Sequence, residues 1–236
     1  MSTAKILPCL IISFSVLIFP EMAMGQRGTL NISIPEVEAT PIGGNRQIWI
    51  RSVTDARAYQ DRPRTPDIPS MGRGLDRTTE AERARAIGRE RDGYGRARRN
   101  VFLPRDKTVK LFVTKLLEHT LTQLGYTVVL DDNALDDNAL DDNALILDAD
   151  VNKFWAWVNV DPAAGWIGSS SPMHLEGEIQ TRINIQDGKN TRQLITAGRG
   201  SHRIFAGLTQ RNWLRTYDLF LEDYIQNLQT ALQQTQ

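Results

Sequence analysis

Alternation of apolar and polar residues predicts the longest strands of this chain. It runs through residues 145–160 and again through 173–186. Such a two-residue period is typical of strands that bury one face. The parity of the first segment changes near residues 152–153, which predicts a β-bulge. Residues 187–189 (Asp-Gly-Lys) predict a hairpin turn, and residues 191–204 the strand that returns from it.

Three shorter segments also carry strand patterns. Residues 29–37 alternate apolar and polar side chains, with Pro35 near the end. Residues 47–53 and 126–130 are rich in β-branched and aromatic residues, which favour strands. The sequence therefore predicts short strands at these three places.

Apolar residues at spacings of three and four predict two amphipathic helices. The first covers residues 107–124, with Asp106 as the expected N-cap and Gly125 as the helix stop. The second begins after Thr209, the expected N-cap, and continues to about Leu232.

The segment 58–105 has a different composition, with many arginines and few large apolar residues. Such a segment buries too little apolar surface to offset the entropy lost on ordering. We therefore expect a long, mobile, basic insertion, with a helical turn or two within residues 79–91. The predicted fold is a single α+β domain over residues 26–236. It has a small, mostly antiparallel sheet of about four to five strands packed against two amphipathic helices.

The first 25 residues have the layout of a secretory signal peptide. Lys5 precedes an apolar stretch at 6–19, and small residues stand at 23 and 25. The stretch is shorter than the ~20 apolar residues that span a bilayer, and it contains a proline. Cleavage would remove Cys9, the only cysteine. Cys9 precedes most of the apolar stretch, so lipidation there is not expected. The predicted location is the periplasm, or association with the outer membrane.

Residues 131–145 are three identical copies of Asp-Asp-Asn-Ala-Leu. The copies do not place oxygen ligands and glycine at the positions of an EF-hand loop. They also differ in residue order from pentapeptide solenoids. We interpret the repeat as a loop lengthened by duplication, and weak calcium association through its six aspartates remains an alternative.

Composition excludes several classes of protein. Twenty-eight Lys and Arg balance twenty-eight Asp and Glu, which argues against binding nucleic acid through bulk charge. One cysteine excludes a disulfide framework and a cysteine-based zinc site. The chain contains neither a nucleophile elbow nor a phosphate-binding loop or zinc-protease motif. The sequence therefore predicts no catalytic residues, metal or cofactor.

Two groups of residues are candidates for binding. Arg96, Arg98 and Arg99 lie in the basic segment, where a solvated linker and a contact with anionic lipid or lipopolysaccharide are the two interpretations. Trp155, Trp157 and Trp166 lie in or near the predicted strand 145–160. They could form core and helix packing, or an exposed aromatic patch that receives a partner or an acyl chain.

The order of elements resembles the YajG-like uncharacterised lipoproteins of Gram-negative bacteria. The likeness includes Val53-Thr54-Asp55-Ala56-Arg57, the helix that ends before Gly125-Tyr126-Thr127-Val128, and Ala149-Asp150-Val151-Asn152. A β-hairpin and a long final helix follow. The resemblance implies an envelope protein without established enzymatic activity. This chain lacks the lipidated cysteine after its apolar stretch, which favours a soluble periplasmic form.

From these features we expect a non-enzymatic protein that acts as a binding or assembly module in the cell envelope. Its expected partner is an envelope protein or an outer-membrane lipid or lipopolysaccharide component. One alternative is a secreted hydrolase that combines residues such as Asp150, His174 and Glu176. Another is binding to anionic surfaces through the arginine-rich segment.

Overall fold

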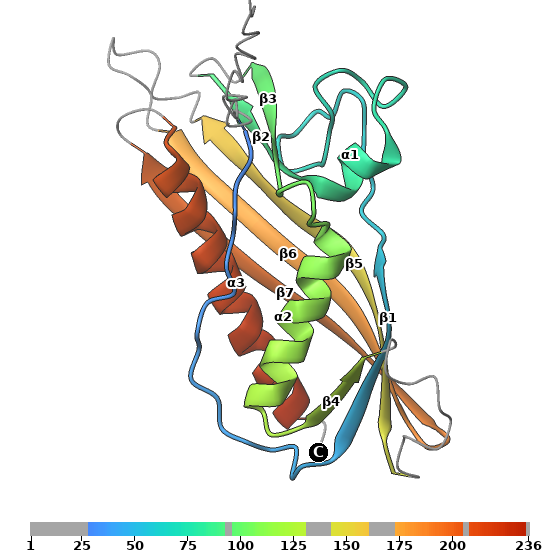
Figure 1. The fold of residues 1–236 in the computed structure, drawn as a ribbon. Coiled ribbons are helices and arrows are strands. Elements are labelled where there is room, and N and C mark those ends of the chain that lie inside the picture. Colours follow the sequence, from blue (N-terminus) through green and yellow to red (C-terminus); the bar gives the residue numbers. More distant parts are fainter. Residues whose placement is uncertain (1–27, 93–95, 131–142, 161–172, 205–207, 235–236) are drawn as a thin grey trace, which may run out of the picture.

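The computed structural model describes residues 28–92, 96–130, 143–160, 173–204 and 208–234. The elements found there are β1 (Gln47–Asp55), α1 (Glu80–Arg85), β2 (Ala86–Arg91), β3 (Ala97–Phe102), α2 (Val109–Gln123), β4 (Thr127–Leu130), β5 (Leu145–Val160), β6 (Met173–Asp187), β7 (Asn190–Ile204) and α3 (Gln210–Gln233). All described strands belong to one sheet (Figure 1).

The sheet has seven strands and is mixed, so the predicted sheet of four to five mostly antiparallel strands is wrong. The long strand β5 lies in the middle. One of its sides pairs with β6, which pairs in turn with β7, and both pairings are antiparallel. Its other side is shared end to end by β1 and β2, which are both parallel to it. β4 lies beside β1 and β3 lies beside β2.

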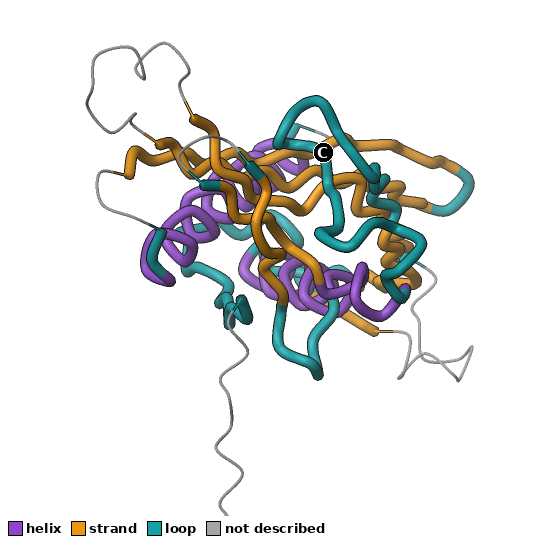
Figure 2. The backbone as a smooth tube through the Cα atoms, turned by 90° about the horizontal axis from the view of Figure 1, so that it is seen from above, coloured by secondary structure: helices purple, strands orange, loops and turns teal. Residues whose placement is uncertain are grey.

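The two long helices cover one face of this sheet (Figure 1, Figure 2). The bulge predicted in β5 is confirmed, because its pairing with β6 shifts register between Val151 and Lys153. Phe154 then faces the helices, where its ring contacts those of Phe112, Tyr217 and Phe220. The core lies between this face and the helices.

Glycines allow α3 to lie close to the sheet. A Cβ atom at Gly198 would stand 2.2 Å from the carbonyl oxygen of Phe220 and 2.4 Å from the amide nitrogen of Tyr224. At Gly177 it would stand 2.4 Å from the Phe220 ring. Separations below 3 Å are incompatible with a side chain there, so these glycines set the spacing between helix and sheet.

The segment 58–105 is part of the fold, which corrects the expectation of an insertion with little regular structure. It contains α1 within the predicted helical stretch, and it supplies β2 and β3 to the sheet. Residues 58–78, which we call the cover segment, lie over the face of the sheet opposite the helices. A second, small core forms beneath it. Its members are Met71, Ala86, Trp155 and Trp157, with Tyr59, Leu75 and Phe102 packed against them.

The structure changes two local predictions and confirms a third. Residues 29–37 form no strand: Thr29 makes an isolated bridge to Phe102, while Leu30 and Ile32 are buried in the core. The N-cap of α2 is Thr108 rather than Asp106. The N-cap of α3 is Thr209, as predicted, and it forms a capping box.

The predicted signal peptide and residues 131–142 of the repeat lie outside the described residues. The last residue of the third repeat copy, Leu145, begins β5. None of the helices within the described ranges combines the length and the apolar character needed to cross a membrane.

Candidate functional site

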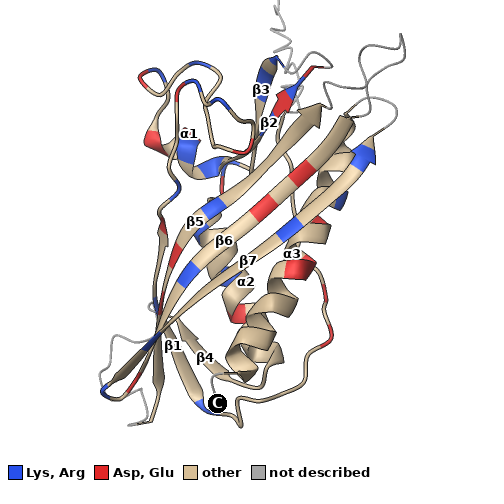
Figure 3. Ribbon diagram, turned by 180° about the vertical axis from the view of Figure 1, so that it is seen from behind, with Lys and Arg blue, Asp and Glu red and all other residues tan. Residues whose placement is uncertain are grey.

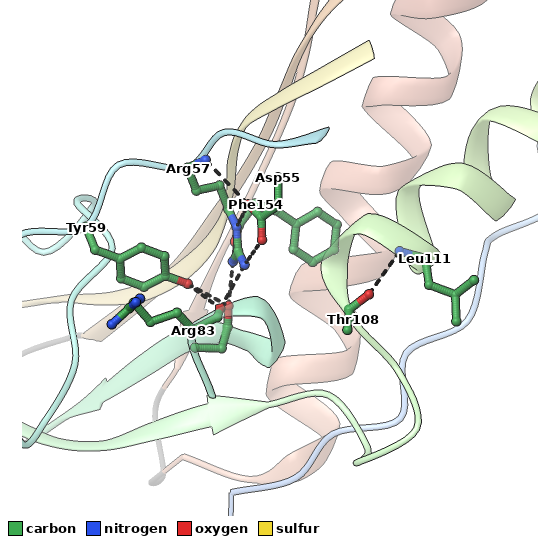
Figure 4. A network of polar contacts seen from close by, with 8 residues as sticks. Asp55, Arg57, Tyr59, Arg83, Thr108, Leu111 and Phe154 are labelled. Atoms are coloured by element: carbon green, nitrogen blue, oxygen red, sulfur yellow. Dashed lines mark hydrogen bonds and ion pairs between the residues drawn. The ribbon is translucent and has the colours of Figure 1, made fainter. Parts of the chain in front are cut away.

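Arg57 stabilises the junction between β1 and β2. At this junction β1 ends and β2 begins, and both strands pair with the same side of β5. Its guanidinium donates hydrogen bonds to the backbone carbonyls of Ala86 at 2.5 Å, Phe154 at 3.3 Å and Arg83 at 2.9 Å (Figure 4). It also forms a two-pronged ion pair with Asp55, with both distances 2.7 Å. Burial opposes the charge, but the hydrogen bonds to Asp55, together with the attraction of Tyr59, Asp55 and Tyr217, raise the pKa of Arg57.

The cover segment is attached at this junction. The Tyr59 hydroxyl donates to the Arg83 carbonyl at 2.8 Å (Figure 4). The Tyr59 ring contacts the Trp155 ring edge to face, with the centroids 6.2 Å apart. Burial raises the pKa of Tyr59 to about 12. The Trp155 indole N–H donates to the Pro66 carbonyl at 3.3 Å. Two aromatic residues and Arg57 therefore place the segment on the sheet.

An open groove lies where the cover segment ends over strands β5, β6 and β7. Its volume is about 630 Å³. Its polar side chains come from the cover segment and from the three strands. The lining residues are Thr65, Pro66, Asp67, Trp157, Asn159, Glu176, Gly177, Glu178, Arg199, Gly200 and Ser201. Figure 3 views the molecule from this side, and basic and acidic residue positions are interspersed along the strands β5, β6 and β7. We call this feature the outer-face groove.

A chain of charges crosses the outer-face groove. The Lys153 ammonium lies 3.1 Å from Asp67 and 3.0 Å from Glu178, and Arg199 lies 3.2 Å from Glu178. Lys153 also stands 5.2 Å from the centroid of the Trp157 ring. Partial burial opposes the charge on Asp67, but hydrogen bonds from Thr65 and Lys153 lower its pKa. These contacts fix the side chains of the groove floor before any ligand arrives.

The rim of the groove is more open than its floor. Asn159 donates to Glu176 at 3.0 Å, and the Arg199 side chain is 77% exposed. Ser201 is also exposed. The rim therefore offers carboxylate, amide, hydroxyl and guanidinium groups to a polar ligand or to a polar segment of a partner protein.

The predicted tryptophan site is not an exposed patch. Trp155 is fully buried and Trp157 is 8% exposed, both under the cover segment. Their parity is opposite to that of Phe154, as the sequence predicted. Trp157 touches the groove with part of its surface, while Trp166 lies outside the described residues.

The three candidate arginines lie on or beside β3, and each has an acidic neighbour. Arg96 is 2.9 Å from Asp92, Arg98 is 3.6 Å from the same carboxylate, and Arg99 is 2.7 Å from Glu90. Arg98 and Arg99 also line a second cleft of about 330 Å³, on the β3 side of the cover segment. Their charge is partly neutralised within the hairpin of β2 and β3.

The residues named for a hydrolase are not brought together. His174 and Glu176 point to the same side of β6, but Asp150 pairs with Arg182 of that strand. Six residues separate Arg182 from Glu176, about 20 Å along an extended strand. Within the described part of the chain, no group of three or more His, Cys, Asp or Glu side chains is arranged to hold a metal ion.

Sequence reasoning missed Lys153, Glu178 and Arg199. One signal was present for two of them: the turn after residue 187 fixes the register of β6 on β7, which places Glu178 opposite Arg199. The contribution of Asp67 depends on the path of the cover segment. A periodic pattern predicts no such path, because the segment has no regular secondary structure over residues 58–78.

Comparisons with known proteins give weak similarities. No protein-family model matches the chain, and no curated protein does. A crystal structure of an uncharacterized protein matches with 9% identity and a TM-score of 0.44, covering 86% of this chain and 97% of the other. A structure of a proposed neuraminyllactose-binding hemagglutinin homolog from Helicobacter pylori matches with 9% identity and a TM-score of 0.33, covering 86% and 94%. Similarity at this level assigns neither a family nor a function.

Proposed function

We propose that this chain is an exported, non-enzymatic binding or assembly module of the bacterial cell envelope. The observation that carries the proposal is the outer-face groove. Its floor is fixed by Lys153 and Glu178, while its rim leaves Asn159, Ser201 and Arg199 open to a partner. A preformed floor reduces the entropy lost when a partner binds.

The groove favours a polar partner over an acyl chain. Glu176, Glu178 and Asp67 face it together with Arg199, so both signs of charge are available. Trp157 offers little apolar surface, since it is 8% exposed. A polar segment of an envelope protein, or the sugar portion of lipopolysaccharide, suits these groups. The resemblance to YajG-like lipoproteins agrees with an envelope location and leaves the partner open.

Site-directed cross-linking in intact cells tests the groove. A photoreactive phenylalanine derivative placed at Ser201 lies on the groove rim, and the same residue at Lys115 lies on the exposed side of α2. We expect a discrete adduct with an envelope protein or lipopolysaccharide from Ser201 only. The adduct is expected to weaken in Arg199→Gln. Equal labelling from both positions, or no adduct from Ser201, would refute binding at the groove.

Export is tested by cell fractionation with mass determination of the N-terminus. The expected result is a periplasmic or outer-membrane-associated protein that lacks residues 1–25. Recovery in the cytoplasm with Met1 to Gly25 attached would contradict the proposed location.

Binding to anionic surfaces is a second candidate, favoured by the cleft that Arg98 and Arg99 line. Deleting the arginine-rich segment is unsuitable as a test, because β2 and β3 belong to the sheet. The triple variant Arg96→Gln, Arg98→Gln and Arg99→Gln keeps the strands and removes three positive charges. If this candidate is right, the variant binds phosphatidylglycerol vesicles at least tenfold more weakly than the wild type. Unchanged binding, or none by the wild type, would exclude it.

A further inference from the structure

Strand β7 forms one side of the sheet and pairs only with β6 among the described strands. In an antiparallel strand, the backbone N–H and C=O groups of one residue point to one side, and those of the next residue point to the other. Half of the backbone groups of β7 therefore point away from β6. Such unpaired groups are a template for another strand.

Helix α3 covers the middle of this free edge with two side chains. The Arg199 amide donates to the Asp223 carboxylate at 2.8 Å, and Asn227 donates to the Ala197 carbonyl at 2.9 Å. These bonds show that Ala197 and Arg199 direct their backbone groups outward. By the two-residue period, Ile195 and Gln193 do so as well, since the pairing of β7 with β6 has no register shift.

The stretch of residues 191–195, which we call the open edge, lies beyond these two contacts. Within the described part of the chain, no hydrogen bond reaches the outward backbone groups of Gln193 or Ile195. Two large apolar residues are exposed in the described part of the chain. Ile195 is the more exposed of the two, at 63%. An unpaired backbone and an exposed β-branched side chain thus coincide.

The charged residues of β7 itself are all positive, although Asp187 lies near Arg192 and Glu178 pairs with Arg199. β7 contains Arg192, Arg199 and Arg203 and no acidic residue. On β6, the exposed Arg182 pairs directly with Ile195. A strand added here would place its side chains near Arg192 and Arg182, so carboxylates on that strand would be stabilised. A second copy of β7 would instead bring arginines together.

We propose that an extended segment of a partner protein, bearing acidic side chains, adds to β7 along the open edge as a further strand. Main-chain hydrogen bonds to Gln193 and Ile195 would supply affinity, and the arginines would select acidic sequences. The open edge shares no residue with the outer-face groove, so this proposal does not depend on the groove being a binding site.

Binding of a fluorescein-labelled peptide with five Glu-Val repeats tests the proposal, with the Lys-Val peptide as its matched control. We expect the acidic peptide to bind at least tenfold more tightly than the basic one. Hydrogen exchange measured on the complex is expected to slow at the amides of Gln193 and Ile195, without change at Lys115.

The variant Ile195→Pro removes the outward N–H without removing a bond to β6, and prolines are tolerated at such positions. We expect it to weaken binding of the acidic peptide at least tenfold, whereas Ile195→Thr, which keeps the N–H, stays within threefold. Circular dichroism checks that both variants fold. If Ile195→Pro does not fold, the hydrogen-exchange measurement on the wild-type complex decides the test. Equal binding of the two peptides, or no slowed exchange, would overturn the proposal. So would a wild-type dimer that Ile195→Pro dissociates, because the occupant would then be a second copy.

Discussion

The two faces of the sheet are covered in different ways. The helix-covered face is mostly apolar, and glycines bring α3 against it. The outer face carries charged side chains, and among the residues that the structure describes it is covered at one end, by a segment held through Arg57 and Tyr59. Close apolar packing fills most of the helix-covered face, where a cavity of about 340 Å³ lies beside Ile48, Tyr126 and Leu232, whereas the partly covered polar face leaves a groove of about 630 Å³. The fold therefore depends mainly on one face, and the binding that we propose depends on the other.

The largest expected effect comes from Arg57→Met, which removes the polar attachment of the outer face. The carbonyls of Arg83, Ala86 and Phe154 lose a donor, and Asp55 loses its partner. Breaking a buried ion pair in this way costs about 3–5 kcal/mol. Urea unfolding should show this loss. A loss below about 1 kcal/mol would mean that the cover segment does not depend on Arg57.

The sequence predicted the central hairpin well but missed how the sheet continues beyond it. The bounds of β5 were predicted correctly because alternation and a hairpin turn are local signals. β2 and β3 were missed because Arg89, Arg91 and Arg98 dilute their apolar pattern. In the structure, carboxylates of the same hairpin pair with two of its arginines, Asp92 with Arg98 and Glu90 with Arg99.

Parallel pairing was missed for a different reason. β1 joins β5 across about a hundred residues of sequence, and no local pattern predicts a contact of that range. The candidate site was therefore only partly predictable. Trp157 and Glu176 could be named from the sequence, but Asp67 reaches the groove only through the path of the cover segment.

The second prediction concerns the helix-covered face. Gly198→Ala places a methyl group against the backbone of α3, where contacts of 2.2 and 2.4 Å cannot be relieved by a side-chain rotation. We expect a loss of about 3 kcal/mol in the free energy of unfolding. Ser201→Val, which enlarges an exposed residue of the same strand, should stay within about 0.5 kcal/mol. Equal effects would remove the distinction between the faces.

A smaller effect is expected from alkaline pH. The pKa of Tyr59 is about 12 in the folded protein and about 10 in an unfolded chain. The folded state therefore retains the Tyr59 hydroxyl proton up to a higher pH than the unfolded state does. The stability that Tyr59 contributes is complete below pH 10 and falls between pH 10 and 12, by about 1.4 kcal/mol per pH unit.

Tyr59→Phe isolates this contribution. Burial also raises the pKa of Tyr217 and Tyr224 on the buried side of α3, so the wild type loses stability through several tyrosines. Urea unfolding at several pH values should show a slope for Tyr59→Phe that is shallower by one proton between pH 10 and 12. An unchanged slope would show that the Tyr59 hydroxyl is not protected by the cover segment.

The smallest effect is expected on the uncovered part of the outer face. Arg51 donates to Asp148 through two nitrogens, and this bond lowers the pKa of Asp148. The Arg51 side chain is 44% exposed, so solvent screens the pair and Arg51→Gln should cost only about 0.5 kcal/mol at pH 7. Because the folded pKa is lowered, the contribution is complete above about pH 4 and is lost as the pH falls through the folded value. The difference between wild type and Arg51→Gln should therefore vanish near pH 2. A difference in stability that persists at pH 2 would come from packing of the Arg51 side chain. Packing would then stabilise the outer face as it stabilises the helix-covered face.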